Sequence, residues 1–156
     1  MPAAAARPTP DPMRPRLYPS DPDRLAVDLL LRRQDSSDKP FVALAPGSAW
    51  GTKRWPYYVE LAKKLGGRSR IAIIGSKADA RVADEITAAL PEGSVINAVG
   101  ALPLLASAEL IGRAQAIVTN DSAPQHLASA MGTPTLTIFG PTVPEFGFGP
   151  LAARLA

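Results

Sequence analysis

Short apolar runs that alternate with amphipathic stretches are the feature that most constrains the fold of this chain. The apolar runs lie at residues 41–45, 71–74, 95–99, 116–118 and 135–139. Between them, apolar residues recur at helical spacing over residues 56–65, 78–90, 103–113 and 122–131. Strands that are apolar throughout and separated by helices indicate a parallel sheet covered on both faces. We therefore predict an α/β fold with a doubly wound, parallel, Rossmann-like sheet.

The segment before the first strand predicts a linker followed by a short helix. Residues 1–23 are rich in proline and alanine. Because proline fixes the backbone and donates no hydrogen bond, this stretch is expected to be extended. A helix then begins at Asp21, with Leu25, Leu29 and Leu30 on one face. The expected organisation is a linker and helix over residues 1–40 and one domain over residues 41–156, which ends as if within an element.

Composition argues against several classes of function. The chain has no cysteine and a single histidine, so neither a disulfide framework nor a transition-metal site is expected, and we predict no cofactor. The net charge of +3 is spread along the chain, whereas a nucleic-acid interface would gather basic residues, so no nucleic-acid partner is expected. A mild positive charge suits an anionic small molecule or an anionic membrane surface. The absence of a signal peptide and of a long apolar run fits a cytoplasmic protein.

The loop at residues 45–56 follows the first predicted strand and leads into a helix. In such sheets, ligands bind beyond the carboxyl ends of the strands, near the point where the strand order reverses. Gly47 lets the backbone approach a ligand closely, Ser48 offers a hydroxyl, and Lys53 places a charge just ahead of a helix start. This combination indicates a phosphate site. The alternative is a structural turn on which Trp50 and Trp55 pack.

Asp79 follows the second predicted strand, four residues after Gly75. An acidic side chain near this place commonly binds a ribose hydroxyl in nucleotide-binding sheets. Asp79 also falls in the first turn of the next helix, where a carboxylate stabilises the helix dipole without any ligand. Both interpretations remain open from the sequence.

The loop at residues 119–126 follows the fourth predicted strand. We predict that Asp121 or Ser122 caps the next helix, whose first amides, including that of Ala123, then form an anion site. His126 lies one turn into that helix, four residues after Ser122 and on the same face. This position favours a role in binding over the alternative, an ordinary core or surface histidine.

These segments resemble glycosyltransferase family 9, the ADP-heptose:lipopolysaccharide heptosyltransferases. The similar strings are APGSAWGTKRWP at 45–56, TNDSAPQHLASAMGTP at 119–134 and TIFGPT at 137–142. The Lys-Arg-Trp-Pro form is most similar to the heptosyltransferase II branch. The resemblance implies a GT-B enzyme with two Rossmann-like domains, of which this chain is the C-terminal, donor-binding half. It also implies an inverting, metal-independent transfer of heptose from ADP-heptose to the lipopolysaccharide inner core.

The resemblance also implies a role for each site residue. Ser48 and Lys53 would contact the diphosphate, Asp121 the sugar hydroxyls and Asp79 the ribose. The amides of the helix start would hold phosphate oxygens, with the histidine beside them. The full set of expected substrate-binding residues is Ser48, Ala49, Lys53, Asp79, Asp121, Ser122, Ala123 and His126. No catalytic residue is expected, because the family's proposed carboxylate base lies in the N-terminal domain, which binds the lipid A–core acceptor.

The sequence departs from the family pattern at one place. Ala123 and Pro124 stand where the commoner signature has Gly-x. Alanine limits the approach of the backbone slightly, and proline donates no amide hydrogen. The departure is harmless only if the missing amide is not a ligand.

Two other functions are compared with this interpretation. One is a module that binds ADP or a nucleotide sugar without chemistry, or an inactive fragment. The other, a nicotinamide-dependent oxidoreductase, is disfavoured because no G-x-G-x-x-G follows the first strand. We expect the chain alone to bind the donor weakly and not to turn it over. The resemblance implies a cytoplasmic protein, with peripheral contact at the cytoplasmic face of the inner membrane as an option.

Overall fold

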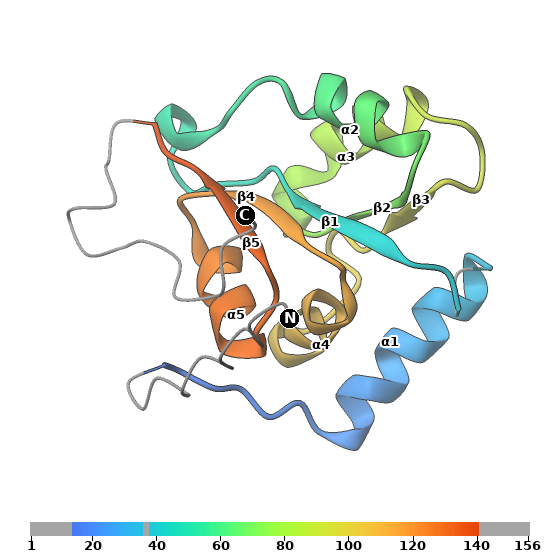
Figure 1. The fold of residues 1–156 in the computed structure, drawn as a ribbon, viewed down its shortest axis with the longest axis vertical. Helices are drawn as coiled ribbons and strands as arrows, with labels where there is room; N and C mark the ends of the chain where they lie inside the picture. Colours follow the sequence, from blue (N-terminus) through green and yellow to red (C-terminus); the bar gives the residue numbers. More distant parts are fainter. Residues whose placement is uncertain (1–13, 36–37, 141–156) are drawn as a thin grey trace, which may run out of the picture.

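The computed structural model describes residues 14–35 and 38–140. Within these residues, five parallel strands form one sheet in the order β3-β2-β1-β4-β5 (Figure 1). The strands are β1 (Phe41–Ala45), β2 (Arg70–Ile73), β3 (Val95–Asn97), β4 (Ile117–Asn120) and β5 (Thr135–Ile138). The order runs outward from β1 in one direction and from β4 in the other, so the switch point lies between these two strands.

Helices cover both faces of the sheet, as Figure 1 shows. The helices are α1 (Asp21–Arg33), α2 (Tyr58–Gly66), α3 (Ala80–Ala88), α4 (Leu104–Arg113) and α5 (Ala123–Met131), and two short 3₁₀ turns are η1 (Gly51–Lys53) and η2 (Lys77–Asp79). Helices α2 and α3 pack on one face, and α1, α4 and α5 pack on the other. The predicted doubly wound, parallel sheet is confirmed.

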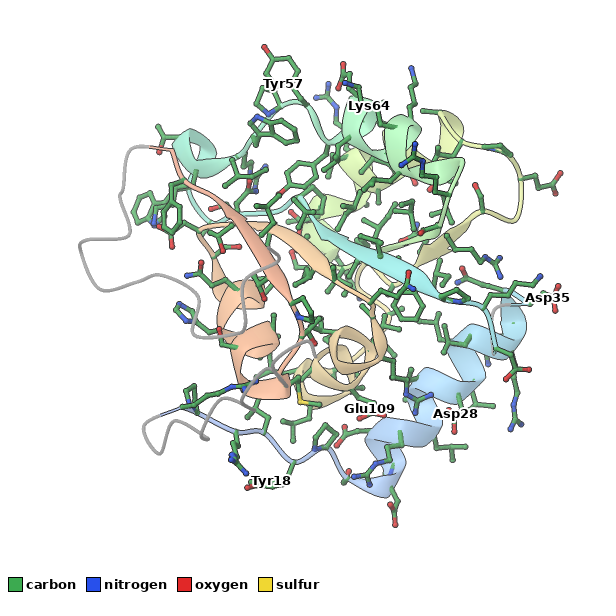
Figure 2. The ribbon with its side chains drawn as sticks, viewed as in Figure 1. Tyr18, Asp28, Asp35, Tyr57, Lys64 and Glu109 are labelled. Atoms are coloured by element: carbon green, nitrogen blue, oxygen red, sulfur yellow. The ribbon has the colours of Figure 1, made fainter. Side chains whose placement is uncertain are left out.

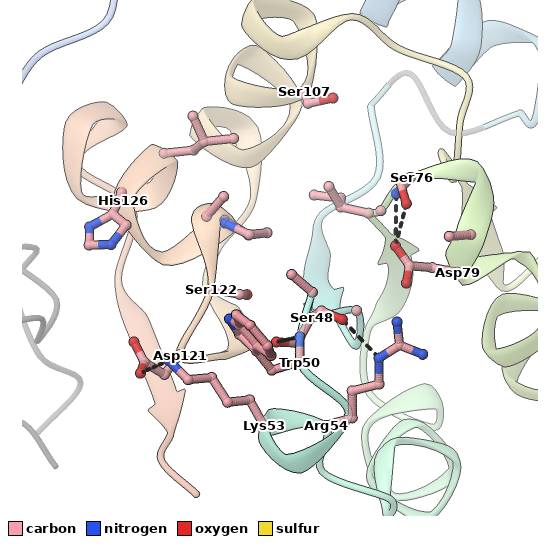
Figure 3. A pocket seen from close by; sticks show the side chains of 18 of the residues that line it. Ser48, Trp50, Lys53, Arg54, Ser76, Asp79, Ser107, Asp121, Ser122 and His126 are labelled. Carbon is pink, nitrogen blue, oxygen red and sulfur yellow. Dashed lines mark hydrogen bonds and ion pairs between the residues drawn. The ribbon is translucent and has the colours of Figure 1, made fainter. Parts of the chain in front are cut away.

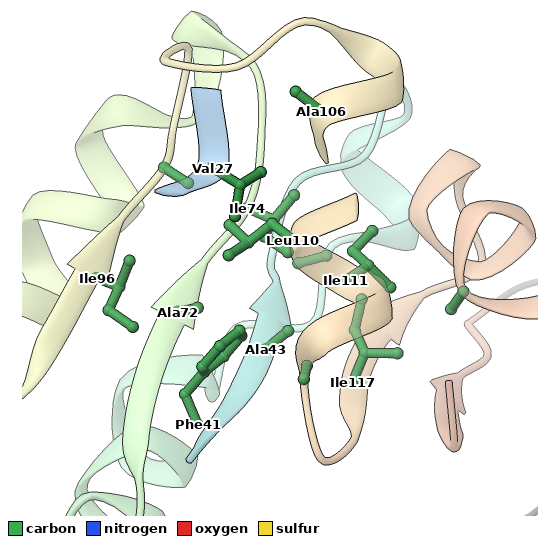
Figure 4. Close-up of a cluster of buried hydrophobic side chains, with 14 of the residues drawn as sticks. Val27, Phe41, Ala43, Ala72, Ile74, Ile96, Ala106, Leu110, Ile111 and Ile117 are labelled. Atoms are coloured by element: carbon green, nitrogen blue, oxygen red, sulfur yellow. The ribbon is translucent and has the colours of Figure 1, made fainter. Parts of the chain in front are cut away.

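Alternation along the strands builds two separate cores. In β1, Ala43 and Ala45 point to the face under α1 and α4, whereas Leu44 points to the face under α2. The first core also contains Leu110 and Ile111 of α4, which lie over the small alanines of the sheet (Figure 4). Small residues on a strand allow a helix with large side chains to pack closely, so both layers reach a dense core.

The buried face of α1 differs from the predicted one. Leu25 and Leu29 are exposed, and only Leu30 of the three predicted leucines packs against the core. The helix instead buries Val27 and Leu31. In each pair, Leu25 with Leu29 and Val27 with Leu31, the two residues are four positions apart. Spacing alone therefore cannot tell which pair faces the protein.

An ion-pair cluster joins α1 to α4. Arg113 of α4 contacts Asp28 of α1 at 2.6 Å and Glu109 of its own helix at 2.8 Å. Figure 2 shows the two carboxylates on neighbouring helices. The hydrogen bond from Arg113 holds the pKa of Asp28 below its usual value, despite an opposing effect of desolvation. The contact links α1 to α4 beside the buried face formed by Val27 and Leu31.

The element boundaries follow the prediction with small differences. Helix α2 begins at Tyr58 rather than at residue 56, and α3 begins only after the 3₁₀ turn η2. The fourth strand continues to Asn120, beyond the apolar run, while the third ends at Asn97. Among the described residues, no helix is long and apolar enough to cross a membrane. Of the predicted arm over residues 1–23, residues 1–13 lie outside the described residues, as does the final segment over 142–156.

Candidate functional site

The carboxyl ends of β1, β2 and β4 surround a cavity of about 970 Å³. The three loops singled out from the sequence form its walls (Figure 3). All eight residues predicted to bind substrate line it, namely Ser48, Ala49, Lys53, Asp79, Asp121, Ser122, Ala123 and His126. The structure therefore brings the predicted set together, at the edge of the sheet where ligands of such folds bind.

Lys53 and Asp121 form an ion pair across this cavity. The distance between Lys53 Nζ and Asp121 Oδ2 is 2.8 Å, although the residues lie 68 positions apart in the chain. Lys53 ends the turn η1 after β1, and Asp121 directly follows β4, so the two strand tips at the switch point supply one partner each. The Asp121 side chain is only 6% exposed, while Lys53 keeps 22%. The Lys53 side chain thus lines the cavity and stays partly accessible from it.

The start of α5 presents backbone amides rather than a side-chain cap. Ser122 occupies the cap position, but its hydroxyl donates to the Asn120 carbonyl at 3.3 Å and makes no bond to the helix amides. The prediction that Asp121 or Ser122 caps α5 is confirmed for the position of Ser122, although its side chain makes no capping hydrogen bond to the helix amides. Within the described part of the chain, the amides of Ser122 and Ala123 have no acceptor. Such amides at a helix start attract anions.

Asp79 makes hydrogen bonds within the second loop, which follows β2. Its carboxylate accepts hydrogen bonds from the Ser76 amide at 2.8 Å and the Ser76 hydroxyl at 3.1 Å. A side chain at Gly47 would place its Cβ 2.5 Å from this carboxylate, and one at Gly75 would come within 2.7 Å. Gly47 therefore makes room for Asp79. Of the two interpretations left open by the sequence, these contacts support a structural role at the start of the helix.

Asn120 is the residue that the sequence reasoning missed. It is fully buried at the tip of β4, and its amide nitrogen donates to the carbonyls of Pro46 at 2.8 Å and Gly47 at 3.3 Å. Its oxygen accepts from the Tyr58 hydroxyl at 3.1 Å and the Trp55 amide at 3.3 Å. Burial raises the pKa of Tyr58, so the phenol stays protonated and donates. One side chain thus holds both ends of the loop that carries Lys53.

The rest of the first loop is also braced from within. Arg54 donates to the Ser48 carbonyl at 2.9 Å, and the Trp50 amide donates to the Ser48 hydroxyl at 3.3 Å. Trp55 packs edge-to-face on Tyr58, with 5.4 Å between ring centroids, whereas Trp50 is 69% exposed at the cavity. The alternative of a turn with both tryptophans packed on it is therefore wrong for Trp50.

Another part of the cavity wall, distinct from the charged pair Lys53 and Asp121, is apolar. It consists of Ile74 after β2, Leu102 and Leu104 at the start of α4, and Leu127 of α5. A ligand that fits both parts has a charged group near Lys53 and a flat or apolar group near these leucines. The described residues contain no group of three or more histidines and carboxylates placed to hold a metal ion.

Comparison with known proteins identifies the family. The model of glycosyltransferase family 9 (heptosyltransferase) matches residues 16–156. The chain belongs to glycosyltransferase family 9. Within this family, it is 36% identical to lipooligosaccharide heptosyltransferase 2 of Haemophilus influenzae over 116 residues, which are 70% of this chain and 34% of that protein. It is 37% identical to lipopolysaccharide heptosyltransferase 2 of Escherichia coli over 118 residues, which are 71% of this chain and 34% of that protein.

Solved structures of family 9 have the same fold. The structure of E. coli ADP-heptose lipopolysaccharide heptosyltransferase II matches with a TM-score of 0.75 and 33% identity, over 89% of this chain and 43% of that one. A family 9 glycosyltransferase from Veillonella parvula matches with a TM-score of 0.79 at 24% identity, over 90% of this chain and 42% of that one. The chain thus spans less than half the length of each of these relatives, and the predicted resemblance to the family is confirmed.

Proposed function

We propose that this chain is the donor-binding half of a GT-B heptosyltransferase that transfers heptose from ADP-heptose to the lipopolysaccharide inner core. The observation that supports this most is the meeting of Lys53, Asp121 and the α5 amides beside one cavity. These groups are suited to a diphosphate and the hydroxyls of an attached sugar. The names of the similar proteins supply the sugar and the acceptor.

In this proposal, the diphosphate lies between Lys53 and the start of α5. The amides of Ser122 and Ala123 bind phosphate oxygens, and the Asp121 carboxylate, beside Lys53, also accepts hydrogen bonds from sugar hydroxyls. The adenosine lies toward the apolar wall of Ile74, Leu102, Leu104 and Leu127. Ser48, Ala49 and His126 border the phosphate and the sugar. A contact between Asp79 and the ribose stays a prediction, because one of its oxygens is already engaged by Ser76.

The reaction would be a direct, inverting displacement. An acceptor hydroxyl forms the new bond to the anomeric carbon, the bond from that carbon to the diphosphate breaks, and ADP leaves with the electron pair. Negative charge then grows on the diphosphate, and the Lys53 ammonium and the α5 amides stabilise it without a metal ion. The proton of the acceptor passes to a base that we assign to the second, acceptor-binding domain.

A narrower function is favoured for the chain taken alone. The carboxylates that line the cavity, Asp79 and Asp121, are already engaged by Ser76 and Lys53. Among the described residues, neither is placed as a base for an incoming acceptor. We therefore expect the 156-residue chain to bind the donor without transferring the sugar, in the cytoplasm or at the cytoplasmic face of the inner membrane.

Isothermal titration of the 156-residue chain with ADP tests the proposal. We expect saturable binding, and the absence of heat at millimolar ADP would contradict the site. Product analysis with ADP-heptose and a heptose-deficient lipopolysaccharide then separates binding from turnover. Transfer by the chain alone would contradict the assignment of the base to another domain.

A further inference from the structure

Arg54 directly follows Lys53 in the chain, but the two side chains leave the loop in different directions. Lys53 extends toward Asp121, beside the tip of β4. Arg54 extends the other way, toward the loop after β2 that carries Asp79 (Figure 3). Both side chains line the cavity, which therefore has one cation on the side of β4 and another on the side of β2. Arg54 was not among the residues predicted to bind substrate.

A hydrogen bond to the main chain holds the Arg54 side chain in this place. Its Nε donates to the Ser48 carbonyl at 2.9 Å. Ser48 follows Gly47, which lies against the Asp79 carboxylate, so the contact keeps the guanidinium on the β2 side of the loop. The bond uses one of the five N–H groups of the side chain. Among the described residues, the two terminal nitrogens make no hydrogen bond.

The charge of Arg54 is not met by an ion pair within the part of the chain that the structure describes. The Lys53 ammonium, in contrast, lies 2.8 Å from the Asp121 carboxylate. Asp79 lines the same cavity as Arg54, but its carboxylate accepts hydrogen bonds from Ser76 and forms no ion pair with the guanidinium. A guanidinium that lines a cavity with two nitrogens directed to no carboxylate is suited to the oxygens of a phosphate.

The proposed function brings two phosphates into this cavity, with a sugar on one and adenosine on the other. Asp121, the acceptor for the sugar hydroxyls, lies beside Lys53, so the lysine is near the phosphate attached to the sugar. The apolar wall assigned to the adenosine includes Ile74, which directly follows β2, and Arg54 lies on that side of the loop. We propose that Arg54 binds the phosphate attached to the nucleoside, while Lys53 binds the phosphate attached to the sugar. This inference rests on the proposed function and adds to it a residue that sets the direction of the donor in the cavity.

The test compares adenosine, AMP and ADP, because AMP has only the phosphate attached to the nucleoside and isolates the contact assigned to Arg54. The variant is Arg54→Gln, whose side-chain amide nitrogen occupies the position of Nε and can keep the bond to the Ser48 carbonyl, while the terminal nitrogens and the charge are lost. We expect this variant to bind AMP about tenfold more weakly, the effect of a charge-assisted hydrogen bond at a partly exposed site. Adenosine should bind as to the wild type. Isothermal titration measures ADP directly, and AMP and adenosine by competition with ADP.

Lys53→Ala should give the complementary result. It should weaken ADP and leave AMP nearly unchanged, because only ADP has the phosphate assigned to the lysine. Unchanged AMP binding by Arg54→Gln, or an equal loss of AMP in both variants, would overturn the inference. Arg81→Gln is the matched control, since it removes the same charge from a side chain that is 92% exposed and lies outside the cavity. It should affect none of the three ligands, and a loss of AMP equal to that of Arg54→Gln would reduce the effect to net charge and overturn the inference.

A role of Arg54 that is limited to bracing the loop predicts a different pattern. Loss of the brace at the Ser48 carbonyl would also displace Lys53, so the advantage of ADP over AMP would shrink. If Arg54 binds the phosphate attached to the nucleoside, that advantage should stay the same, and the advantage of AMP over adenosine should fall instead. Thermal melting checks that each variant is folded. Arg54→Met, which keeps the aliphatic stem and removes every donor, replaces the glutamine variant if that one is not folded, and the same pattern is expected.

The experiment distinguishes failure of the inference from failure of the proposed function. If the wild-type chain does not bind ADP, the proposed function fails and the inference fails with it. If the wild type binds ADP and Arg54→Gln binds AMP as the wild type does, only the inference fails. The same holds if the wild type binds AMP no better than adenosine, because no group of the site would then contact the phosphate attached to the nucleoside.

Discussion

Asp79 and Asp121 are both buried carboxylates beside the same cavity, but different parts of the chain hold them. Asp79 is 8% exposed and is bound by Ser76, three residues before it. Asp121 is 7% exposed and is bound by Lys53, 68 residues away. The first is fixed by a local turn that a ligand cannot displace easily. The second is held by a cation that a phosphate can attract, so the type of partner indicates which acid takes part in binding.

The largest expected effect is that of Lys53→Ala on ADP binding. Removing the ammonium should weaken ADP by about 20- to 100-fold, the value of a charge-assisted hydrogen bond. Adenosine, which has no phosphate, should bind about equally to both proteins. Isothermal titration with the two ligands makes the comparison. Equal losses for ADP and adenosine would mean that Lys53 does not contact phosphate. The partner of Asp121 would then give no reason to assign Asp121, rather than Asp79, to ligand binding.

Substitution of Gly47 tests whether Asp79 is fixed by the local structure of the loop. Gly47→Ala should lower the free energy of unfolding by about 2 kcal/mol, because its Cβ would collide with the Asp79 carboxylate. Gly51→Ala, in the same loop, meets nothing within 4 Å and should change stability little. Urea denaturation of both variants measures the difference. If the two substitutions had the same effect, Asp79 would not be wedged against the loop.

The smallest expected effect is the difference in stability between the two acid-to-alanine variants. Asp79→Ala should lose about 1 kcal/mol or more of unfolding free energy, because two hydrogen bonds at a helix start disappear. Asp121→Ala should lose less, about 0.5 kcal/mol, because the remaining lysine is partly exposed and can turn to solvent. Denaturant unfolding at neutral pH compares them. A larger loss for Asp121 would reverse the roles that we assign.

The fold and the site differ in how far the sequence could predict them. The alternation of apolar runs and helices predicted the sheet and the edge where the cavity lies, because these depend on local periodicity. The prediction of which face of α1 is buried was wrong, because Leu25 and Leu29 have the same spacing as Val27 and Leu31. Both members of the Lys53–Asp121 pair were predicted one by one. Their contact was not, because spacing in the sequence carries no information about distances between separate loops.

Asn120 shows the same limit for a structural residue. It follows an apolar run directly, and the sequence reasoning took the next residue, Asp121, as the first site residue of that loop. The partners of Asn120 are the carbonyls of Pro46 and Gly47, the amide of Trp55 and the hydroxyl of Tyr58. Three of these four belong to the main chain, which has no signature in a sequence. A polar residue at the end of an apolar strand is the only available signal.

The contacts of Asn120 also affect how this site can diverge. Because the Asn120 amide contacts mainly backbone atoms, β4 fixes the two ends of the loop from Pro46 to Trp55, while Ser48 and Arg54 brace the part between them. Substitutions between those two points can then alter the chemistry presented to a ligand while the scaffold keeps its course. A change in the ligand preference of this site would then require new side chains within the loop and no new path for its two ends.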